Sequence, residues 1–159
     1  FADGGHIANW MVGHCEELNA RLKIHFVQDI FKGVMYLHDN NTIHGDIHEQ
    51  NILVFSDRLS PLNRWTAKLT DFGHGLVSAA GNQYLFRQPL TAEEFNGKLQ
   101  SDRRRMTFEM QKVIGFPSVR HSVEELQILD VLKDMCKFIR ENNVGIAGIY
   151  NQYKNYLDM

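Results

Sequence analysis

The chain has 159 residues, of which 43% are hydrophobic and 23% charged, and this length and composition suit one globular domain. Its 17 basic and 19 acidic residues give a net charge of −2, which provides no general attraction for nucleic acid or for an anionic membrane surface. Three prolines and ten phenylalanines exclude collagen-like, mucin-like and wholly disordered chains, and no apolar run approaches the ~20 residues that span a bilayer.

The N-terminal part predicts two helices. The chain opens at Phe1 rather than at a methionine, so we expect an upstream part to be missing. A short helix through Ile7 and Trp10 follows an Asp-Gly-Gly turn signal. A longer helix is expected from residues 18–19 to 39–41, because apolar residues recur there at spacings of three and four. Its stripe is wide enough to predict a mostly buried helix and comprises Leu22, Phe26, Val27, Ile30, Phe31, Val34, Met35 and Leu37.

Short strand-like pieces follow at residues 42–44, 51–55 and 67–70. The loop-like composition of residues 56–66 predicts that the second and third pieces form a hairpin. Residues 74–100 are rich in Gly, Ser, Asn and Gln and have little periodicity, which predicts a long irregular segment.

The C-terminal part predicts two helices and a weaker third. The pair Ser101-Asp102 is expected to cap the first helix, which a Gly-Phe-Pro sequence ends. Ser122 and Glu125 form a capping box for the second helix. Residues 146–157 are expected to form the weaker helix.

Two short strings carry residue types suited to phosphoryl transfer: residues 44–51, His-Gly-Asp-Ile-His-Glu-Gln-Asn, and residues 69–73, Leu-Thr-Asp-Phe-Gly. Such a transfer needs metal ions that neutralise phosphate charge and a group that orients the attacking hydroxyl. Asp46 can accept the hydrogen bond of that hydroxyl, while Asn51 and Asp71 offer the oxygen ligands that Mg²⁺ prefers. The expected hairpin would bring all three residues to one end.

These strings resemble the protein kinase family, whose catalytic loop reads His-Arg-Asp, four residues and Asn, and whose metal-binding motif reads Asp-Phe-Gly. The resemblance is good over residues 18–75, weak over 76–117 and absent over 118–159, which are helical and divergent. It implies a single domain over residues 1–159 with a mainly helical α+β fold and small β hairpins. This domain corresponds to the C-terminal lobe of a kinase, with the upper lobe absent.

The resemblance also implies roles for individual residues. Asp46 and His48 are the expected catalytic residues; His48 stands where the family has lysine, arginine or alanine, and as a substitute for lysine it would contact phosphate or substrate. His44 is expected to support the loop. The cofactors implied are ATP and Mg²⁺, expected only when an upper lobe is present, with Asn51 and Asp71 as metal ligands and a cofactor site comprising Asn51, Asp71, Phe72 and Gly73.

Three departures from the family pattern stand out. Gly45 replaces the arginine that normally reaches a phosphorylated activation loop, and Leu90 replaces a glutamate whose ion pair supports the lower lobe. The helix after Ser101-Asp102 is normally apolar and buried, yet it carries three arginines here, at 103–105. Unpaired buried charge costs several kcal/mol, so we expect this helix not to lie in the usual core in that register.

Three functions remain open. The first is a cytoplasmic protein kinase that transfers the ATP γ-phosphoryl group to a Ser or Thr hydroxyl, with the isolated fragment inactive. The second is a pseudokinase-like regulatory module or remnant. The third is a small-molecule kinase of the aminoglycoside or choline type, whose loop reads His-Gly-Asp-x-His-x-x-Asn but which usually lacks Asp-Phe-Gly. The expected partners are a protein substrate or regulatory protein, not nucleic acid or membrane. The two isolated cysteines favour a reducing compartment.

Overall fold

The computed structural model describes the chain except for residues 1, 57–63, 71–75, 78–83, 86–87 and 118–120. The chain is mainly helical with small antiparallel β hairpins, as the sequence predicts. In chain order the elements are α1 (Ile7–Gly13), α2 (Ala20–Asp39), β1 (Thr42–Ile43), the 3₁₀ turn η1 (Glu49–Asn51), β2 (Ile52–Ser56), β3 (Trp65–Leu69), β4 (Leu76–Val77), β5 (Tyr84–Leu85), β6 (Gln88–Pro89), α3 (Ala92–Gly115), α4 (Val123–Glu141) and α5 (Ile146–Leu157).

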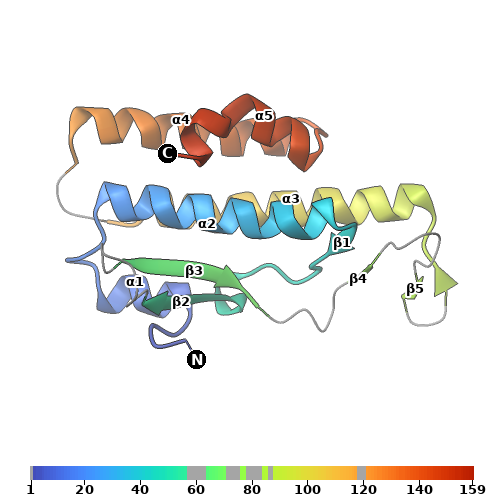
Figure 1. Ribbon diagram of the computed structural model, residues 1–159, viewed down its shortest axis with the longest axis horizontal. Helices are drawn as coiled ribbons and strands as arrows, with labels where there is room; N and C mark the ends of the chain where they lie inside the picture. The colour runs from blue at the N-terminus through green and yellow to red at the C-terminus, as the bar shows by residue number, and fades with distance from the viewer. Residues whose placement is uncertain (1, 57–63, 71–75, 78–83, 86–87, 118–120) are drawn as a thin grey trace.

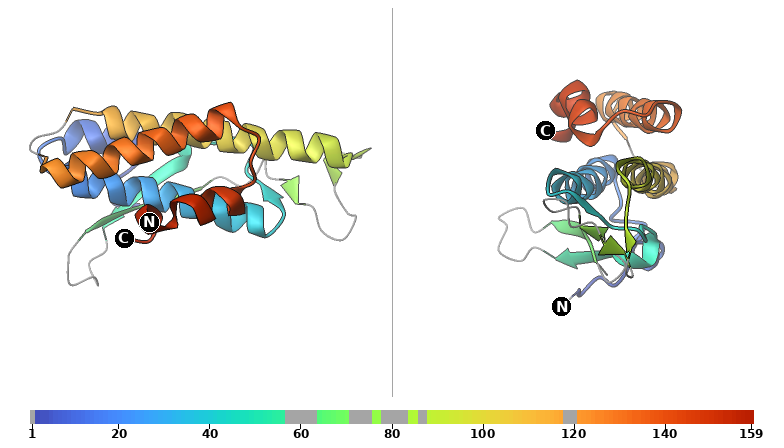
Figure 2. Two further views of the ribbon diagram at one scale, coloured as in Figure 1. Left: turned by 90° about the horizontal axis from the view of Figure 1, so that it is seen from above. Right: turned by 90° about the vertical axis from the view of Figure 1, so that its right-hand side faces the viewer.

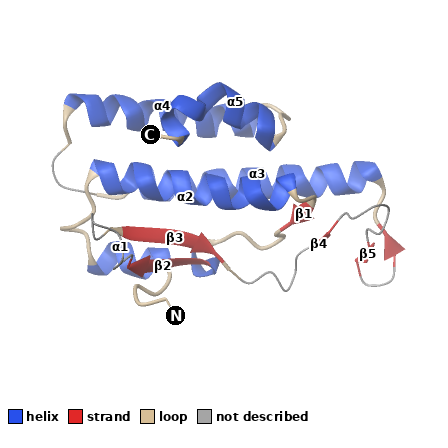
Figure 3. Cartoon of the chain, in the orientation of Figure 1, coloured by secondary structure: helices blue, strands red, loops and turns tan. Residues whose placement is uncertain are grey.

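The elements form three layers (Figures 1 and 2). Helices α2 and α3 lie side by side in the middle, α4 and α5 cover one face, and the β2–β3 hairpin with α1 covers the other. The strands are confined to one side of the helices (Figure 3). None of the helices in the described part of the chain is long and apolar enough to cross a membrane.

Helix α2 is the centre of this arrangement. The side chain of Asn19 caps it by accepting a hydrogen bond from the backbone N–H of Leu22 at 2.9 Å. Layers pack on both sides of the helix, so its apolar stripe is buried almost all round, and Phe26 and Phe31 are fully buried. Asn41, just beyond the helix, has a φ of 53°, a conformation that asparagine tolerates better than most residues. The predicted helix and its end are confirmed.

The predicted hairpin is also confirmed. Strands β2 and β3 pair antiparallel from Ile52 opposite Leu69 to Ser56 opposite Trp65. The backbone N–H of Thr70 donates to the carbonyl of Asn51 at 2.8 Å. The end of β3 is therefore fixed beside the end of the 44–51 loop. Most of the predicted connecting loop, residues 57–63, lies outside the described residues.

Helix α3 differs from the expectation at its start. It begins at Ala92 rather than near residue 101, because Thr91 and Glu94 form a capping box there. Residues 92–100 are helical, so the prediction of an irregular segment up to residue 100 is wrong for this part. Leu90, which stands in place of a family glutamate, packs against the buried side chains of Ile43 and Phe95.

Helix α3 lies in the core despite its three arginines, and the expectation about its register relative to the family stays a prediction. Helix α3 packs against both α2 and α4, and Arg103 is buried. The guanidinium of Arg103 donates to Oδ1 of Asn143 at 3.0 Å, while Arg104 and Arg105 are exposed. The helix places only one of the three arginines inside and gives its guanidinium a polar partner, which offsets part of the cost of burying its charge.

The C-terminal helices agree with the sequence analysis. Helix α3 ends at Gly115, and the ammonium of Lys23 donates to the carbonyl of Ile114 at 2.9 Å, which stabilises that end. Helix α4 begins with the predicted capping box of Ser122 and Glu125. Helix α5 coincides with the predicted weak helix.

Candidate active site

The 44–51 loop connects β1 to β2 and lies next to the C-terminal end of α2. Gly45 has a φ of 86°, in the left-handed region where a Cβ atom is disfavoured. The glycine that replaces the family arginine therefore fits the conformation that the loop adopts.

Three predicted site residues meet in this loop. Nδ2 of Asn51 donates to the backbone carbonyl of Asp46 at 2.8 Å and to Oδ2 of the same residue at 3.1 Å. Nε2 of His48 lies 3.4 Å from that Oδ2 atom. Nδ1 of His48 accepts a hydrogen bond from the backbone N–H of Gln50 at 3.1 Å, and its Nε2 also lies 3.2 Å from Nδ2 of Asn51. Asn51 thus donates to a carboxylate oxygen that the His48 ring also approaches.

His44 is fully buried and joins the loop to the hairpin. Its Nδ1 accepts from the backbone N–H of Asp46 at 3.1 Å, which leaves the proton of the neutral ring on Nε2. Nε2 then donates to the carbonyl of Thr70 at 2.7 Å. One imidazole therefore fixes the position of Asp46 relative to the residue that precedes Asp71 in the sequence.

Asp102 is a residue of this site that the sequence analysis assigned only to a helix cap. It lies inside α3, 3% exposed, and its carboxylate accepts from the backbone N–H groups of His44 at 2.7 Å and Gly45 at 2.9 Å. Nε2 of His38 lies 3.1 Å from the same carboxylate. The signal was present in the sequence, because residue 102 falls on the same face as Met106 and Met110, four and eight positions later.

A second, weaker tether joins α3 to the loop at the surface. The ammonium of Lys112 lies 3.5 Å from the carboxylate of Glu49 and 3.3 Å from that of Glu109. These neighbouring carboxylates raise the pKa of Lys112, against an opposing effect of burial.

The predicted residues Asp71, Phe72 and Gly73 lie outside the described residues, so the described part of the site consists of His44, Asp46, His48 and Asn51. Among the described residues no group of three or more His, Cys, Asp or Glu side chains is arranged to hold a metal ion. Oδ1 of Asn51 and Oδ1 of Asp46 accept no hydrogen bond from the described residues. Both oxygen atoms are therefore available to a ligand.

Comparisons with known proteins identify the family of the chain. The family model described as protein tyrosine and serine/threonine kinase matches residues 1–91. The dual specificity protein kinase zakA of Dictyostelium discoideum is 32% identical over a region covering 44% of this chain and 10% of that protein. The human tyrosine-protein kinase ZAP-70 is 29% identical over 52% of this chain and 12% of that protein. The probable serine/threonine-protein kinase gdt8 of Dictyostelium discoideum is 40% identical over 33% of this chain and 4% of that protein.

The matched regions span only about a tenth or less of these relatives, so the comparisons concern a part of a kinase. The family model nevertheless matches more than half of the chain, and its match contains the whole 44–51 loop and the hairpin. The chain belongs to the protein tyrosine and serine/threonine kinase family.

Proposed function

We propose that residues 44–51 are the catalytic loop of a protein kinase that transfers the γ-phosphoryl group of ATP to a serine or threonine hydroxyl of a protein. The observation that carries this proposal is the convergence of His48 Nε2 and Asn51 Nδ2 on one oxygen of Asp46, in a chain of a kinase family. A carboxylate held by the Asn51 amide beside the His48 ring keeps a fixed direction, and its other oxygen stays free for the substrate hydroxyl.

In this mechanism Asp46 orients the attacking hydroxyl and accepts its hydrogen bond. The side chain is about two-fifths exposed, so a substrate can reach it. His48 lies beside the carboxylate, with Nε2 3.4 Å from Oδ2 of Asp46, and we assign it to contact phosphate or substrate. His44 is a positioning residue, since it acts only through the backbone of Asp46 and Thr70.

The donor set fits Mg²⁺ and ATP. Asn51 offers an amide oxygen without a hydrogen bond from the described residues, and Asp71 follows the strand end that Asn51 holds. We assign these two residues as the metal ligands, with Phe72 and Gly73 completing the cofactor site. When bound, the ion neutralises the negative charge of the phosphates. Both cysteines are free, as in a reducing compartment, and we assign the activity to the cytoplasm.

A second candidate is transfer to the hydroxyl of a small molecule. The left-handed Gly45 and the contact between His48 and Asp46 match the two positions at which this loop resembles aminoglycoside and choline kinases rather than protein kinases. The two candidates predict the same chemistry at Asp46 and differ in the acceptor.

The test is transfer of radiolabelled γ-phosphate by the full-length protein that contains this chain, with generic protein substrates and, separately, with choline and kanamycin. We expect label on protein, and Asp46→Asn should reduce the rate by at least about 100-fold. Asp39→Asn, an exposed carboxylate at the end of α2, is the matched control and should keep the wild-type rate.

Label on choline or kanamycin alone would establish the second candidate. Absence of transfer to either class, with nucleotide still bound, would contradict both candidates and identify a pseudokinase. Equal rates for wild type and Asp46→Asn would show that the catalytic assignment is wrong.

A further inference from the structure

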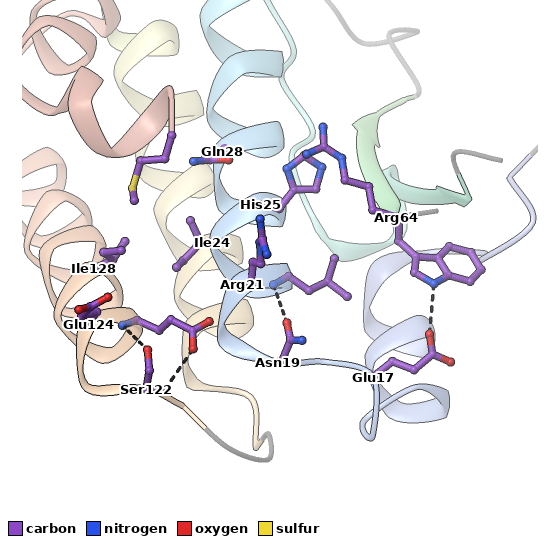
Figure 4. A pocket seen from close by; sticks show the side chains of 14 residues that line it. Glu17, Asn19, Arg21, Ile24, His25, Gln28, Arg64, Ser122, Glu124 and Ile128 are labelled. Carbon is purple, nitrogen blue, oxygen red and sulfur yellow. Dashed lines mark hydrogen bonds between the residues drawn. The ribbon is translucent and has the colours of Figure 1, made fainter. Parts of the chain in front are cut away.

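Two parts of the surface differ in the charges that they carry. A pocket of about 880 Å³ lies between the N-terminal half of α2, the start of β3 and the N-terminus of α4 (Figure 4). Its lining mixes both signs of charge, with arginines at 21 and 64 and glutamates at 17, 124 and 125. Opposite charges side by side largely cancel, so this pocket does not select a ligand by its charge.

The exposed face of α3 carries charge of one sign instead. After its first turn, the exposed charged side chains of this helix are Arg104, Arg105 and Lys112, all of them positive. The acids in the same stretch, Asp102 and Glu109, are buried, and their carboxylates contact the 44–51 loop and Lys112 respectively. The exposed face of α4 carries both signs, as is usual for a solvated helix, at Glu124, Asp130, Lys133, Asp134, Lys137 and Glu141.

The two arginines have no counter-charge of their own. Lys112 lies within ion-pair distance of Glu109 and Glu49. Arg104 and Arg105 form no ion pair and no side-chain hydrogen bond with the part of the chain that the structure describes. Glu109 is four residues after Arg105, but it is buried and held by Lys112. Neighbouring guanidinium groups repel each other, so an added carboxylate would be attracted to both.

An exposed aromatic side chain adjoins the two arginines. Phe108 is 56% exposed, although most large apolar side chains of the described chain are buried. It lies four residues after Arg104 and three after Arg105, and residues at these spacings are neighbours on a helix surface. We call these three side chains the α3 patch. An inorganic anion would leave the ring in water, whereas a peptide with acidic and apolar side chains would cover the whole patch.

The α3 patch lies beside the candidate catalytic loop. Lys112 is seven residues, or about two turns, after Arg105, so both are on the same side of α3, and Lys112 contacts Glu49 of the loop. Asp102, one turn before Arg105, holds the first residues of the loop. A peptide bound to the patch would therefore run alongside the loop that contains Asp46.

We propose that the α3 patch binds an acidic segment of the protein substrate, in which an apolar side chain accompanies aspartate or glutamate. The carboxylates pair with Arg104 and Arg105 in the two-pronged geometry that guanidinium allows, and the apolar side chain packs on Phe108. The inference rests on the proposed function, because it takes the bound segment to be part of the substrate. Binding itself requires none of the loop residues, so it can be measured separately from transfer.

The first test measures binding without transfer. Fluorescence anisotropy follows a labelled peptide of Glu, Asp and Leu, which has no hydroxyl group, mixed with the full-length protein that contains this chain. The Arg104→Ala/Arg105→Ala variant should bind it about 10-fold more weakly, the loss expected for two exposed ion pairs. Thr107 bonds only to the backbone carbonyl of Arg104, so this hydrogen bond survives the substitution. Equal affinity of variant and wild type would overturn the proposal.

The matched control is Lys133→Ala/Lys137→Ala, which removes two exposed cations from the face of α4 that carries both signs. This variant should bind like wild type, and circular dichroism confirms that each variant folds. A loss equal to that of the arginine variant would show a general effect of net charge and would overturn the proposal.

Two further variants separate the contributions of charge and apolar contact. Arg104→Glu/Arg105→Glu should bind a peptide with Lys in place of Glu and Asp more tightly than wild type does. Phe108→Ala should weaken binding of the acidic peptide about three-fold, since the partly exposed ring supplies apolar contact area. A single-stranded oligonucleotide at about 10-fold excess should not displace the peptide. Displacement, or no effect of Phe108→Ala, would show that only polyanion binding occurs and would overturn the proposal.

The second test connects the patch to the substrate. Transfer to a serine peptide with the acidic segment is compared with transfer to the same peptide with Ala in that segment. Arg104→Ala/Arg105→Ala should raise KM for the acidic peptide about 10-fold, with kcat unchanged and no effect on the Ala peptide. Equal KM values of wild type for both peptides would overturn the proposal. Binding of the acidic peptide without any transfer would contradict the proposed function and support the α3 patch as a docking site.

Discussion

The two ends of α2 are held to the rest of the molecule by different forces. At the C-terminal end, the 44–51 loop is held by polar groups, with Asp102, His44 and His38 forming hydrogen bonds out of water. At the N-terminal end, apolar packing dominates, and Phe26 lies edge-on to Trp10 at 5.2 Å between ring centres. Hydrogen bonds fix direction and distance, whereas apolar contacts supply most of the free energy of burial. The polar end is therefore suited to orienting a reactive group, and the apolar end to stabilising the fold.

The largest expected effect is at the apolar end. Phe26→Ala should lower the free energy of unfolding by about 3–5 kcal/mol, because it leaves a cavity where no side chain is exposed. Urea unfolding followed by circular dichroism measures the change. Tyr36→Ala, at an exposed position of the same helix, is the control and should change stability by less than about 0.5 kcal/mol. Equal losses of unfolding free energy for Phe26→Ala and Tyr36→Ala would contradict the proposed role of packing at this end.

The polar end should show a smaller loss of stability but a larger loss of function. Asp102→Asn keeps the shape but turns an N–H group toward a backbone N–H, and an unsatisfied buried donor costs about 1–3 kcal/mol. We expect urea unfolding to show this loss and the phosphoryl-transfer rate of the still folded protein to fall more than 10-fold. Glu109→Gln, a buried acid on the same helix without a contact to His44 or Gly45, should retain most of the rate. Retention of the full rate by Asp102→Asn would show that the loop needs no anchor in α3.

Two titrating side chains of α2, Asp29 and His25, should change the free energy of unfolding in opposite directions as the pH rises. Burial raises the pKa of Asp29 from 3.8 to about 6, although its carboxylate accepts a hydrogen bond from Ala67, and burial lowers the pKa of His25 to about 4. The raised pKa of Asp29 gives stability that is present below about pH 4 and is lost as pH rises through 6. The lowered pKa of His25 instead makes the folded state more stable as the pH rises from 4 to 6.5.

Nε2 of His25 lies 3.2 Å from Oδ2 of Asp29, so each variant also changes the surroundings of the other group, and the two are compared by the sign of their pH response. Asp29→Asn should therefore gain stability relative to wild type on going from pH 4 to 7. His25→Gln should instead lose stability relative to wild type over the same range. Urea unfolding at half-unit pH intervals measures both curves, and parallel curves for the two variants would contradict the assignment.

The smallest expected effect concerns the surface tether between α3 and the loop. Glu49→Gln removes the ion pair with Lys112 and leaves the buried Glu109 its partner, and this pair is worth less than about 1 kcal/mol at an exposed position. The unfolding free energy should change by less than that amount, and the transfer rate by less than about three-fold. A loss as large as that of Asp102→Asn would mean that the surface tether, rather than the buried anchor, fixes the loop.

Local sequence signals account for most of the correctly predicted elements. The apolar periodicity of α2, the capping box of Ser122 and Glu125, and the alternation around Leu69 each act within a few residues, so they were readable without the fold. The same kind of signal was present at Thr91 and Glu94, where the polar composition of the surrounding residues outweighed it and the start of α3 was misplaced. The clustering of Asp46, His48 and Asn51 also followed from the sequence, since all three lie in one loop of eight residues.

What the sequence by itself determined is the set of local elements and the residue types of the loop, because hydrogen-bonded turns, caps and apolar stripes are decided by near neighbours. Only the tertiary structure decided that Asp102 anchors a loop 57–58 residues away and that Arg103 is buried against Asn143, 40 residues later. A buried charge is tolerated only where distant groups satisfy it. The packing of α3 against both α2 and α4 brings those groups together, and no local sequence pattern predicts that packing.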